Sequence, residues 1–465
     1  MKIANILLIT LFLTFLSGCS SFNERSIASE DDYEKITPQF QTFLDVESKH
    51  NPGKAKFDQK PLDLSFVEIE INDEQMYLAD SHDQWMVGPQ GAKGPDAFIF
   101  DHASYLPKDV KKYFYNVKDG KKYFRFYFHP YDTSQKTNVL EYLSSKSIPH
   151  EVLESGKLKA YSTASKSLIA YDKDSGRAFS LKTSTNGTVQ GTDFFESRPY
   201  PTRWSYMVRM LSDSFYRVRH KLQSVSVAFE PLATGIPSID QSNSVRLMED
   251  VSKGKLTHIS GFVFNDLEKR EELAAKAGMS VDEFWTEAFR IKGRAMAEMG
   301  LYLGILVTSN HAQNFRWEIG NDGKLTGRVV FLDLSDVSPI KNIHSALGNE
   351  TFIDRWNKYV GNTNAMKTDD RIRFSNFFRG DHNSSIEEKW HTIMGEAAID
   401  RASEILNIDK QILEEKIVSE YSPKSWSIDI NSDQRIKDAF NIHKENLSSI
   451  RINNCQRSIV RILED

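Results

Sequence analysis

Hydrophobic and polar residues alternate along several short stretches of this chain. In one, Val67, Ile69 and Ile71 alternate with two glutamates; in another, Phe124, Phe126 and Phe128 alternate with Arg125 and Tyr127 and lead into His129-Pro130. A period of two residues is typical of a half-buried strand. The same reasoning predicts strands over residues 167–171 and 178–183 and at Val225 and Val227.

A helical period dominates the second half of the chain. Phe284, Ala288, Ile291 and Ala295 recur at spacings of four and three, which predicts a helix over Val281–Leu303. Its apolar stripe requires a packing partner, so we expect a core helix. Helical patterns also cover residues 204–219, 386–406 and 436–447, and we expect the chain after Pro339 to be mainly helical.

The first residues are typical of a secretory signal peptide. Lys2 precedes a mainly apolar run that closes on Leu16-Ser17-Gly18-Cys19. This run is too short to remain in a bilayer as a spanning helix. Its end resembles a bacterial lipobox, which implies a diacylglycerol and an N-acyl lipid on Cys19. An uncleaved anchor or an ordinary signal peptide is the alternative.

The lipid would anchor the chain to a membrane of the bacterial cell envelope. Ser20, directly after the cysteine, is compatible with the outer membrane. Residues 20–61 are polar, and we interpret them as a flexible tether. No later stretch is apolar enough for a transmembrane helix.

Charge and cysteine content narrow the classes of function. The formal net charge is −5, so a basic excess that would favour nucleic acid as a partner is missing. The chain has two cysteines, Cys19 and Cys455. With Cys19 lipidated, the sequence predicts neither an internal disulfide nor a cysteine-rich metal site.

One hairpin carries candidate chemistry. Asn321-Asp322-Gly323 separates two runs rich in Phe, Trp, Ile and Val, which is a hairpin signal. A hairpin of this length would bring Asn314, at its start, close to Asp333, at its end. An amide oxygen and a carboxylate are hard ligands suited to Mg²⁺, and kinase-like sites use such a pair. The alternative is a solvated loop held by structural hydrogen bonds.

A family resemblance joins this hairpin to motifs upstream. The chain resembles the NRPS-independent siderophore synthetases, the aerobactin-synthetase-like ligases that use ATP to join citrate-type carboxylates to amines or alcohols. His311-Ala312-Gln313-Asn314 matches the family's His-x-Gln-Asn motif. The other similar segments, in the family's order, are Phe128-His129-Pro130-Tyr131, Ser162 to Leu168, Phe179 to Ser184, Val227 to Glu230 and Phe331 to Leu334.

The resemblance implies roles for individual residues. Lys182 would contact ATP phosphates and, with His311, belong to the catalytic group. The nucleotide would also be bound by Ser165, Lys166, Ser167, Glu230 and Gln313, and Mg²⁺ by Asn314 and Asp333. For His129, a structural role before Pro130 is at least as plausible. The expected partners are a nucleotide, a carboxylate small molecule and the membrane.

The chain also departs from the family's pattern. The early His-Pro-x-His-Lys motif that serves the carboxylate substrate has no counterpart in the first 120 residues. Family arginines are replaced by Lys166, Phe194 and Leu332, with Arg198 near the second of these. Because a polyphosphate needs guanidinium groups to offset its desolvation, two hypotheses stay open: an ATP- and Mg²⁺-dependent ligase or phosphotransferase, and a non-catalytic surface lipoprotein that binds a ligand or protein partner on a reused scaffold.

Together these observations predict an α+β fold after the signal peptide. We expect mixed antiparallel sheets, a kinase-like palm and a helical C-terminal part. The predicted segments are the signal peptide 1–19, the tether 20–61, an N-terminal α/β part 62–200, a palm-like core 201–345 and a helical part 346–465.

Overall fold

The computed structural model of the chain covers its strands and helices from Leu62 to Leu447. The residues described are 61–71, 99–102, 110, 112–130, 132–162, 167–172, 174–183, 218–227, 232–236, 239, 241–248, 256–307, 312, 314–332, 337–348, 350, 353–354, 370–374, 388–420 and 425–447. The predicted signal peptide, Cys19 and nearly all of the predicted tether lie outside these ranges, as does most of the helix predicted over 204–219.

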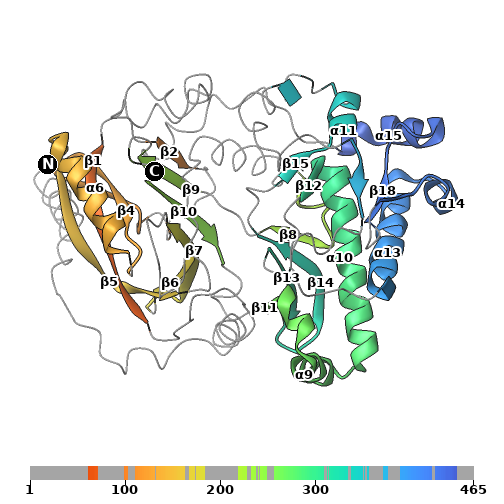
Figure 1. The fold of residues 1–465 in the computed structure, drawn as a ribbon, viewed down its shortest axis with the longest axis horizontal. Coiled ribbons are helices and arrows are strands. Elements are labelled where there is room, and N and C mark those ends of the chain that lie inside the picture. Colours follow the sequence, from red (N-terminus) through yellow and green to blue (C-terminus); the bar gives the residue numbers. More distant parts are fainter. Residues whose placement is uncertain are drawn as a thin grey trace, which may run out of the picture.

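A nine-stranded sheet forms the first body of the molecule (Figure 1). Its strand order is β2-β9-β10-β7-β6-β5-β1-β4-β3, and every neighbouring pair is antiparallel. The strands are β1 (Leu62–Ile71), β2 (Ile99–His102), β3 (Tyr115–Lys118), β4 (Lys121–Tyr127), β5 (His150–Ser162), β6 (Ser167–Asp172), β7 (Arg177–Thr183), β9 (Leu232–Ile236) and β10 (Gln241–Leu247).

This sheet curls so that strands distant in its order meet. The side chain of Asn243, on β10, accepts a hydrogen bond from the backbone N–H of Tyr127 at 2.7 Å and donates to its carbonyl at 3.1 Å. Tyr127 ends β4, which lies five places away from β10 in the sheet order. Because the amide replaces a strand partner for Tyr127, a polar side chain can be buried here at little cost. Helix α6 (Thr133–Ser145) follows β4 and begins at the side-chain cap of Asp132.

The second body is built around α10 (Val281–Leu303). Ser280 and Glu283 form a capping box at its start, and Gly304 ends it in the left-handed conformation. Against it packs a four-stranded sheet of order β11-β13-β14-β8, formed by β8 (Val225–Val227), β11 (Leu256–Ser260), β13 (Phe315–Gly320) and β14 (Leu325–Phe331). The 3-10 helix η3 (Gly261–Asn265) and α9 (Leu267–Ala277) lie between β11 and α10 in the chain.

Aromatic side chains fill the space between α10 and this sheet. Trp317 of β13 packs edge-on against Trp285 and Phe289 of α10, and its indole N–H donates to the carbonyl of Ala288 at 2.8 Å. On the other side of α10 lies α13 (Glu388–Leu406). A Cβ added at Gly293 would stand 2.1 Å from the carbonyl oxygen of Met394, so the two helices touch at their backbones.

Further short elements complete the second body. They are α11 (Lys341–Ala346), α14 (Lys410–Glu414), α15 (Gln434–Leu447) and a small sheet of β16 (Ile372–Arg373), β17 (Val418–Glu420) and β18 (Ser425–Ile428). The helices predicted over 386–406 and 436–447 are therefore confirmed, with starts at 388 and 434. Helices make up most of the described residues after Pro339, in agreement with the expectation. The three-stranded sheet among them was not predicted, because its strands of two to four residues are too short to show a period.

The predicted mixture of helices and antiparallel sheets is confirmed. Helix 281–303, the hairpin around residues 321–323 and the strands near residues 67, 124, 167, 178 and 225 are all present. A segment boundary was predicted at residue 200. The large sheet continues past that residue, because it includes β9 and β10. The kinase-like palm stays a prediction.

Candidate functional site

Two pairs of strands bracket the candidate site. Strand β12 (Ile305–Val307) pairs antiparallel with β15 (Val337–Pro339), and Val307 lies opposite Val337. In the hairpin, Phe315 lies opposite Phe331. Segment 308–314 joins β12 to β13, and segment 332–336 joins β14 to β15. Both segments therefore run between the same two strand pairs. The ends of the two segments are held side by side.

Asn314 is fixed at the base of this arrangement. It is only 7% exposed, and its backbone carbonyl accepts a hydrogen bond from the backbone N–H of Leu332 at 2.8 Å. Leu332 directly precedes Asp333 in the chain. The hairpin thus brings Asn314 to the neighbour of the predicted carboxylate, while Asp333 itself lies outside the described residues.

Close backbone contacts hold the segment that leads to Asn314. The hydroxyl of Ser260 donates to the carbonyl of Ala312 at 3.4 Å. Next to it, a Cβ added at Gly261 would lie 2.5 Å from the Phe315 ring and 2.8 Å from the same carbonyl. Only glycine allows η3 to approach so closely, so the conformation around Asn314 depends on that residue.

A buried lysine lies against the ring of Phe315, the residue after Asn314. Lys292 of α10 has no exposed surface, and its Nζ lies 3.1 Å from the centroid of the Phe315 ring. Burial holds the pKa of Lys292 well below its ordinary value. Its amine thus packs on the ring of the aromatic residue that directly follows Asn314. Lys292 was not among the residues predicted from the sequence, although a lysine on the apolar stripe of a core helix is an unusual feature.

Two other predicted residues meet in the large sheet. Ser167 of β6 lies opposite Lys182 of β7, and Lys182 lies opposite Ser244 of β10. The structure therefore groups the described candidates into two sets, Ser167 with Lys182 in the first body and Asn314 in the second. Outside the described residues lie Cys19, Ser165, Lys166, Glu230, His311, Gln313 and Asp333.

His129 occupies a structural position. It is 2% exposed, and its backbone N–H donates to the side chain of Gln135 at 2.8 Å, which ties the end of β4 to α6. Burial lowers the pKa of His129 to about 4, so the ring is neutral at pH 7.

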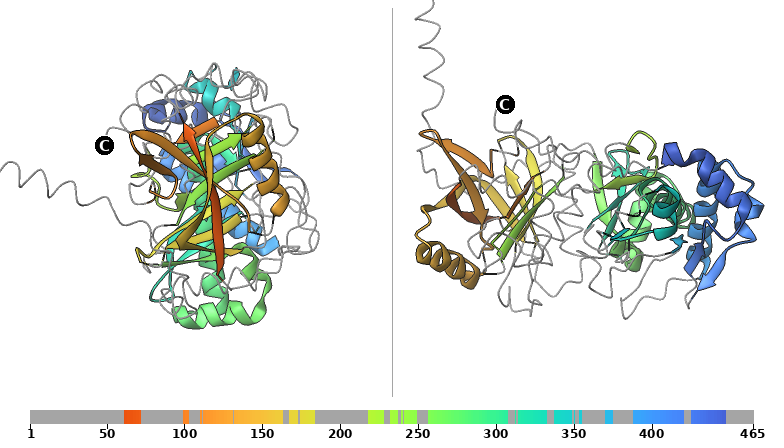
Figure 2. Two further views of the ribbon diagram at one scale, coloured as in Figure 1. Left: turned by 90° about the vertical axis from the view of Figure 1, so that its left-hand side faces the viewer. Right: turned by 90° about the horizontal axis from the view of Figure 1, so that it is seen from above.

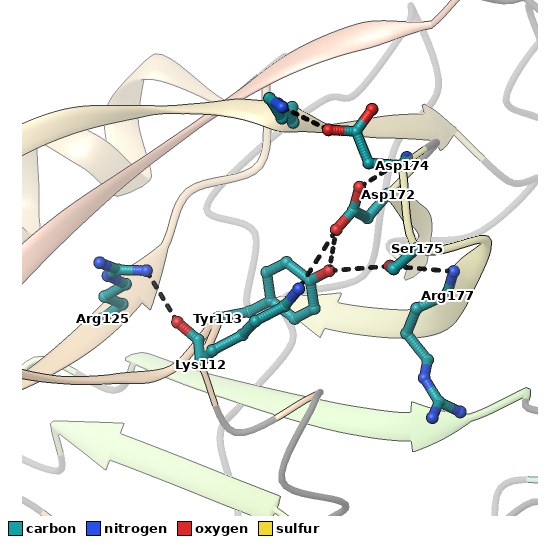
Figure 3. A network of polar contacts seen from close by, with 8 residues as sticks. Lys112, Tyr113, Arg125, Asp172, Asp174, Ser175 and Arg177 are labelled. Atoms are coloured by element: carbon teal, nitrogen blue, oxygen red, sulfur yellow. Dashed lines mark hydrogen bonds and ion pairs between the residues drawn. The ribbon is translucent and has the colours of Figure 1, made fainter. Parts of the chain in front are cut away.

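A partly buried polar network links the segment before β3 to the turn between β6 and β7 (Figure 3). The hydroxyl of Tyr113 donates to the carboxylate of Asp172 and lies 3.3 Å from that of Ser175; Lys112 Nζ lies 3.5 Å from Asp172. Burial and the adjacent carboxylate raise the pKa of Tyr113. Burial alone would raise the pKa of Asp172, and its hydrogen bonds outweigh that effect and lower it. A protonated phenol and an ionised acid form a stable donor–acceptor pair, so this network is a structural tie.

A second charged pair sits between helices. Glu298 of α10 has no exposed surface and accepts hydrogen bonds from Arg401 of α13 at 2.9 Å and from the backbone N–H groups of Gln223 and Ser224. It therefore fixes the loop that enters β8. Sequence periodicity cannot find such a pair, because its members are distant in the chain.

Neither a cluster of metal ligands nor a membrane-spanning helix is found among the described residues. Within the described ranges, no group of three or more His, Cys, Asp or Glu side chains is arranged to hold a metal ion. No helix among those residues is long and apolar enough to cross a bilayer.

Comparison with known proteins gives a distant likeness in fold. No protein-family model and no curated protein matches the chain. The aerobactin synthetase IucC from a hypervirulent pathotype of Klebsiella pneumoniae is 12% identical with a TM-score of 0.40, over 61% of this chain and 50% of that one. The petrobactin biosynthesis protein AsbB from Bacillus anthracis is 12% identical with a TM-score of 0.41, over 66% and 55%. WaaP, solved in complex with acyl carrier protein, is 11% identical with a TM-score of 0.23, over 44% and 78%.

This chain therefore matches only about half the length of either siderophore-biosynthesis protein. Identities and scores of this size carry no argument about activity.

Proposed function

We propose that this protein binds a nucleotide with Mg²⁺ and acts as a carboxylate–amine ligase or a phosphotransferase. The observation that carries the proposal is the bracketed pair of segments, 308–314 and 332–336, with the Asn314–Leu332 hydrogen bond between them. This arrangement supports a site in which the amide of Asn314 and the carboxylate of Asp333 bind one ion. The order of the sequence motifs from Phe128 to Asp333 supports it independently.

The donor set fits Mg²⁺. Amide and carboxylate oxygens are the hard ligands that this ion prefers, and it keeps several waters and phosphate oxygens as further ligands, so two protein groups suffice. Bound there, the ion would neutralise charge on the phosphates. Lys182, a point charge flanked by hydroxyls, would hold the phosphate chain, and His311 and Gln313 would line the nucleotide.

Nucleotide binding is tested on the full-length chain in detergent by thermal unfolding with Mg²⁺-ATP. A ligand at about 100 times its Kd stabilises the folded state by about 2.7 kcal/mol. We expect that stabilisation in the wild type and its loss in Asp333→Asn and Asn314→Ala. Asp322→Asn, the same substitution at the turn of the same hairpin, is the matched control and keeps it. If wild type and Asp333→Asn respond alike to ATP, the proposed site is wrong.

We also propose that the protein is anchored to the cell envelope by a lipid on Cys19. The Leu16-Ser17-Gly18-Cys19 pattern after an apolar run supports this. The test is incorporation of labelled palmitate in bacteria that express the full chain. We expect labelling of the wild type and none of Cys19→Ala; equal labelling of both would rule out the anchor.

A further inference from the structure

One face of the large sheet gathers two cations and three hydroxyls. Lys182 of β7 lies directly between Ser167 of β6 and Ser244 of β10, and Ser180 of β7 lies opposite Arg246 of β10. Directly opposed residues in an antiparallel sheet point to the same face, with Cβ atoms about 4.5–5.5 Å apart. Arg246 is therefore the diagonal neighbour of Lys182 on the next strand. We call these five residues the cationic face.

The cationic face points away from the core of its own body. The alternate residues of β7, Phe179 and Leu181, are fully buried, and Phe179 packs against the rings of Phe114 and Tyr113 at 5.5 and 5.6 Å. Figures 1 and 2 show β6, β7 and β10 on the side of the large sheet that lies nearer the second body. The second body turns its four-stranded sheet, and not α10, toward them. The cationic face is thus placed toward the body that carries Asn314.

The chemistry of the face suits a phosphate chain. Ser180 and Ser244 are buried, whereas Ser167, Lys182 and Arg246 are partly exposed. Hydroxyls can donate to phosphate oxygens, Lys182 supplies a point charge, and a guanidinium can bind two oxygens at once. Such a set has the positive charge that offsets the desolvation of a polyanion.

We propose that Arg246 is a further phosphate-binding residue, and that it binds the phosphate chain of the nucleotide together with Lys182, Ser167 and Ser244. This inference rests on the proposed nucleotide-binding function and deepens it. It supplies a guanidinium at the site from β10, a strand that no sequence motif covers.

The test compares Arg246→Gln and Arg246→Lys with wild type in the full-length chain. The matched control is Arg290→Gln, on the exposed side of α10. Binding of Mg²⁺-ATP, Mg²⁺-tripolyphosphate and inorganic phosphate is measured by calorimetry. We expect Arg246→Gln to raise the Kd of ATP and of tripolyphosphate about tenfold or more. Arg246→Lys keeps the charge but loses the guanidinium that can bind two oxygens at once, so its Kd should lie between those of Arg246→Gln and wild type.

The outcomes separate the two proposals. An unchanged Kd in Arg246→Gln, while wild type binds ATP, overturns the role of Arg246 and leaves the nucleotide function intact. If wild type binds tripolyphosphate in an Arg246-dependent way but not ATP, the cationic face stands and the nucleotide function fails. Binding of neither polyphosphate by wild type overturns both. If Arg246→Gln does not fold, the test rests on Arg246→Lys. A Kd equal to that of wild type in Arg246→Lys argues against the bidentate contact that we propose.

Discussion

The large sheet and the body around α10 bury charged groups in different surroundings. In the sheet, the carboxylate of Glu68 on β1 is 1% exposed and accepts hydrogen bonds from Arg125 on the adjacent strand β4 and from Asn116 and Lys118 on β3, the strand beyond it. In the second body, Glu298 lies on a core helix and is paired across a helix interface with Arg401. Both carboxylates are buried, but the cations that bind Glu68 are partly exposed, with Lys118 at 43% and Arg125 at 21%, whereas Arg401 is only 8% exposed.

This difference bears on how each body would present its part of the proposed site. The second body is packed so closely that backbones touch, at Gly261 beside Ala312 and at Gly293 beside Met394. Such packing can hold Asn314 in one position. The large sheet has, besides its aromatic core, polar contacts between distant segments, Asn243 with Tyr127 and Tyr113 with Asp172. The face of β7 opposite that core carries polar residues. The proposed site would draw on both, the rigid element around Asn314 for the metal ion and the polar face of β7 for the phosphates.

The largest effect is expected from Arg401→Met in the second body. The variant leaves Glu298 buried without its guanidinium, and breaking a buried ion pair costs about 3–5 kcal/mol. Denaturant unfolding measures the loss, with Arg290→Met on the exposed side of α10 as control. Adding Glu298→Gln should recover part of the stability, because the uncompensated charge is then removed. A loss of less than about 1 kcal/mol would place this pair with ordinary surface ion pairs and erase the contrast between the bodies.

Tyr113→Phe tests the tie that closes the large sheet. The substitution removes the phenol that donates to the buried carboxylate of Asp172. Hydrogen bonds to charged groups contribute about 1.5–3 kcal/mol, so we expect a loss of that size. Tyr123→Phe, on β4, is the control in the same unfolding experiment. Equal stabilities for the two variants would mean that the network in Figure 3 does not hold the sheet closed.

The smallest effect, and the one that depends on pH, is expected from Glu68→Gln. Burial alone would raise the pKa of Glu68, and three hydrogen bonds outweigh that effect and lower it. A depressed pKa stabilises the folded state above the unfolded value of about 4.3, and this contribution is lost as the pH falls through the folded value. The variant should therefore be about 1–2 kcal/mol less stable at pH 7.

The gap between Glu68→Gln and wild type should close as the pH is lowered below about 4, once wild-type Glu68 becomes protonated. Unfolding curves from pH 7 down to the acid limit measure it. Glu70→Gln, two residues along β1 and more exposed, is the matched control. A gap that stays constant over this range would show that the charge of Glu68 is not what stabilises the sheet.

The same contrast explains how far the sequence alone could predict the fold. Helix α10 and the β13–β14 hairpin were predictable because their signals are local, a stripe of apolar residues in one and an Asp-Gly turn in the other. Strand β10 was not, since Gln241, Asn243 and Ser244 are polar yet buried. The side chain of Asn243 is satisfied by Tyr127, more than a hundred residues away.

The candidate site was also predictable from the sequence only in part. The hairpin predicted that Asn314 would meet the strand end before Asp333, and the backbone hydrogen bond to Leu332 agrees with that register. Arg246 and Lys292 escaped the sequence analysis. Arg246 belongs to the cationic face because β10 pairs with β7, a strand distant in the sequence. Lys292 contacts Phe315 from α10, which precedes the hairpin in the chain.

The most direct test of the account is whether the two bracketed segments bind a divalent ion together. Mn²⁺ substitutes for Mg²⁺ at oxygen sites, and its binding to the full-length chain in the presence of ATP can be followed by electron paramagnetic resonance. We predict a single tightly bound ion in wild type and in Asp322→Asn, and none in Asp333→Asn. Binding that survives Asp333→Asn unchanged, or its absence from wild type, would contradict the account.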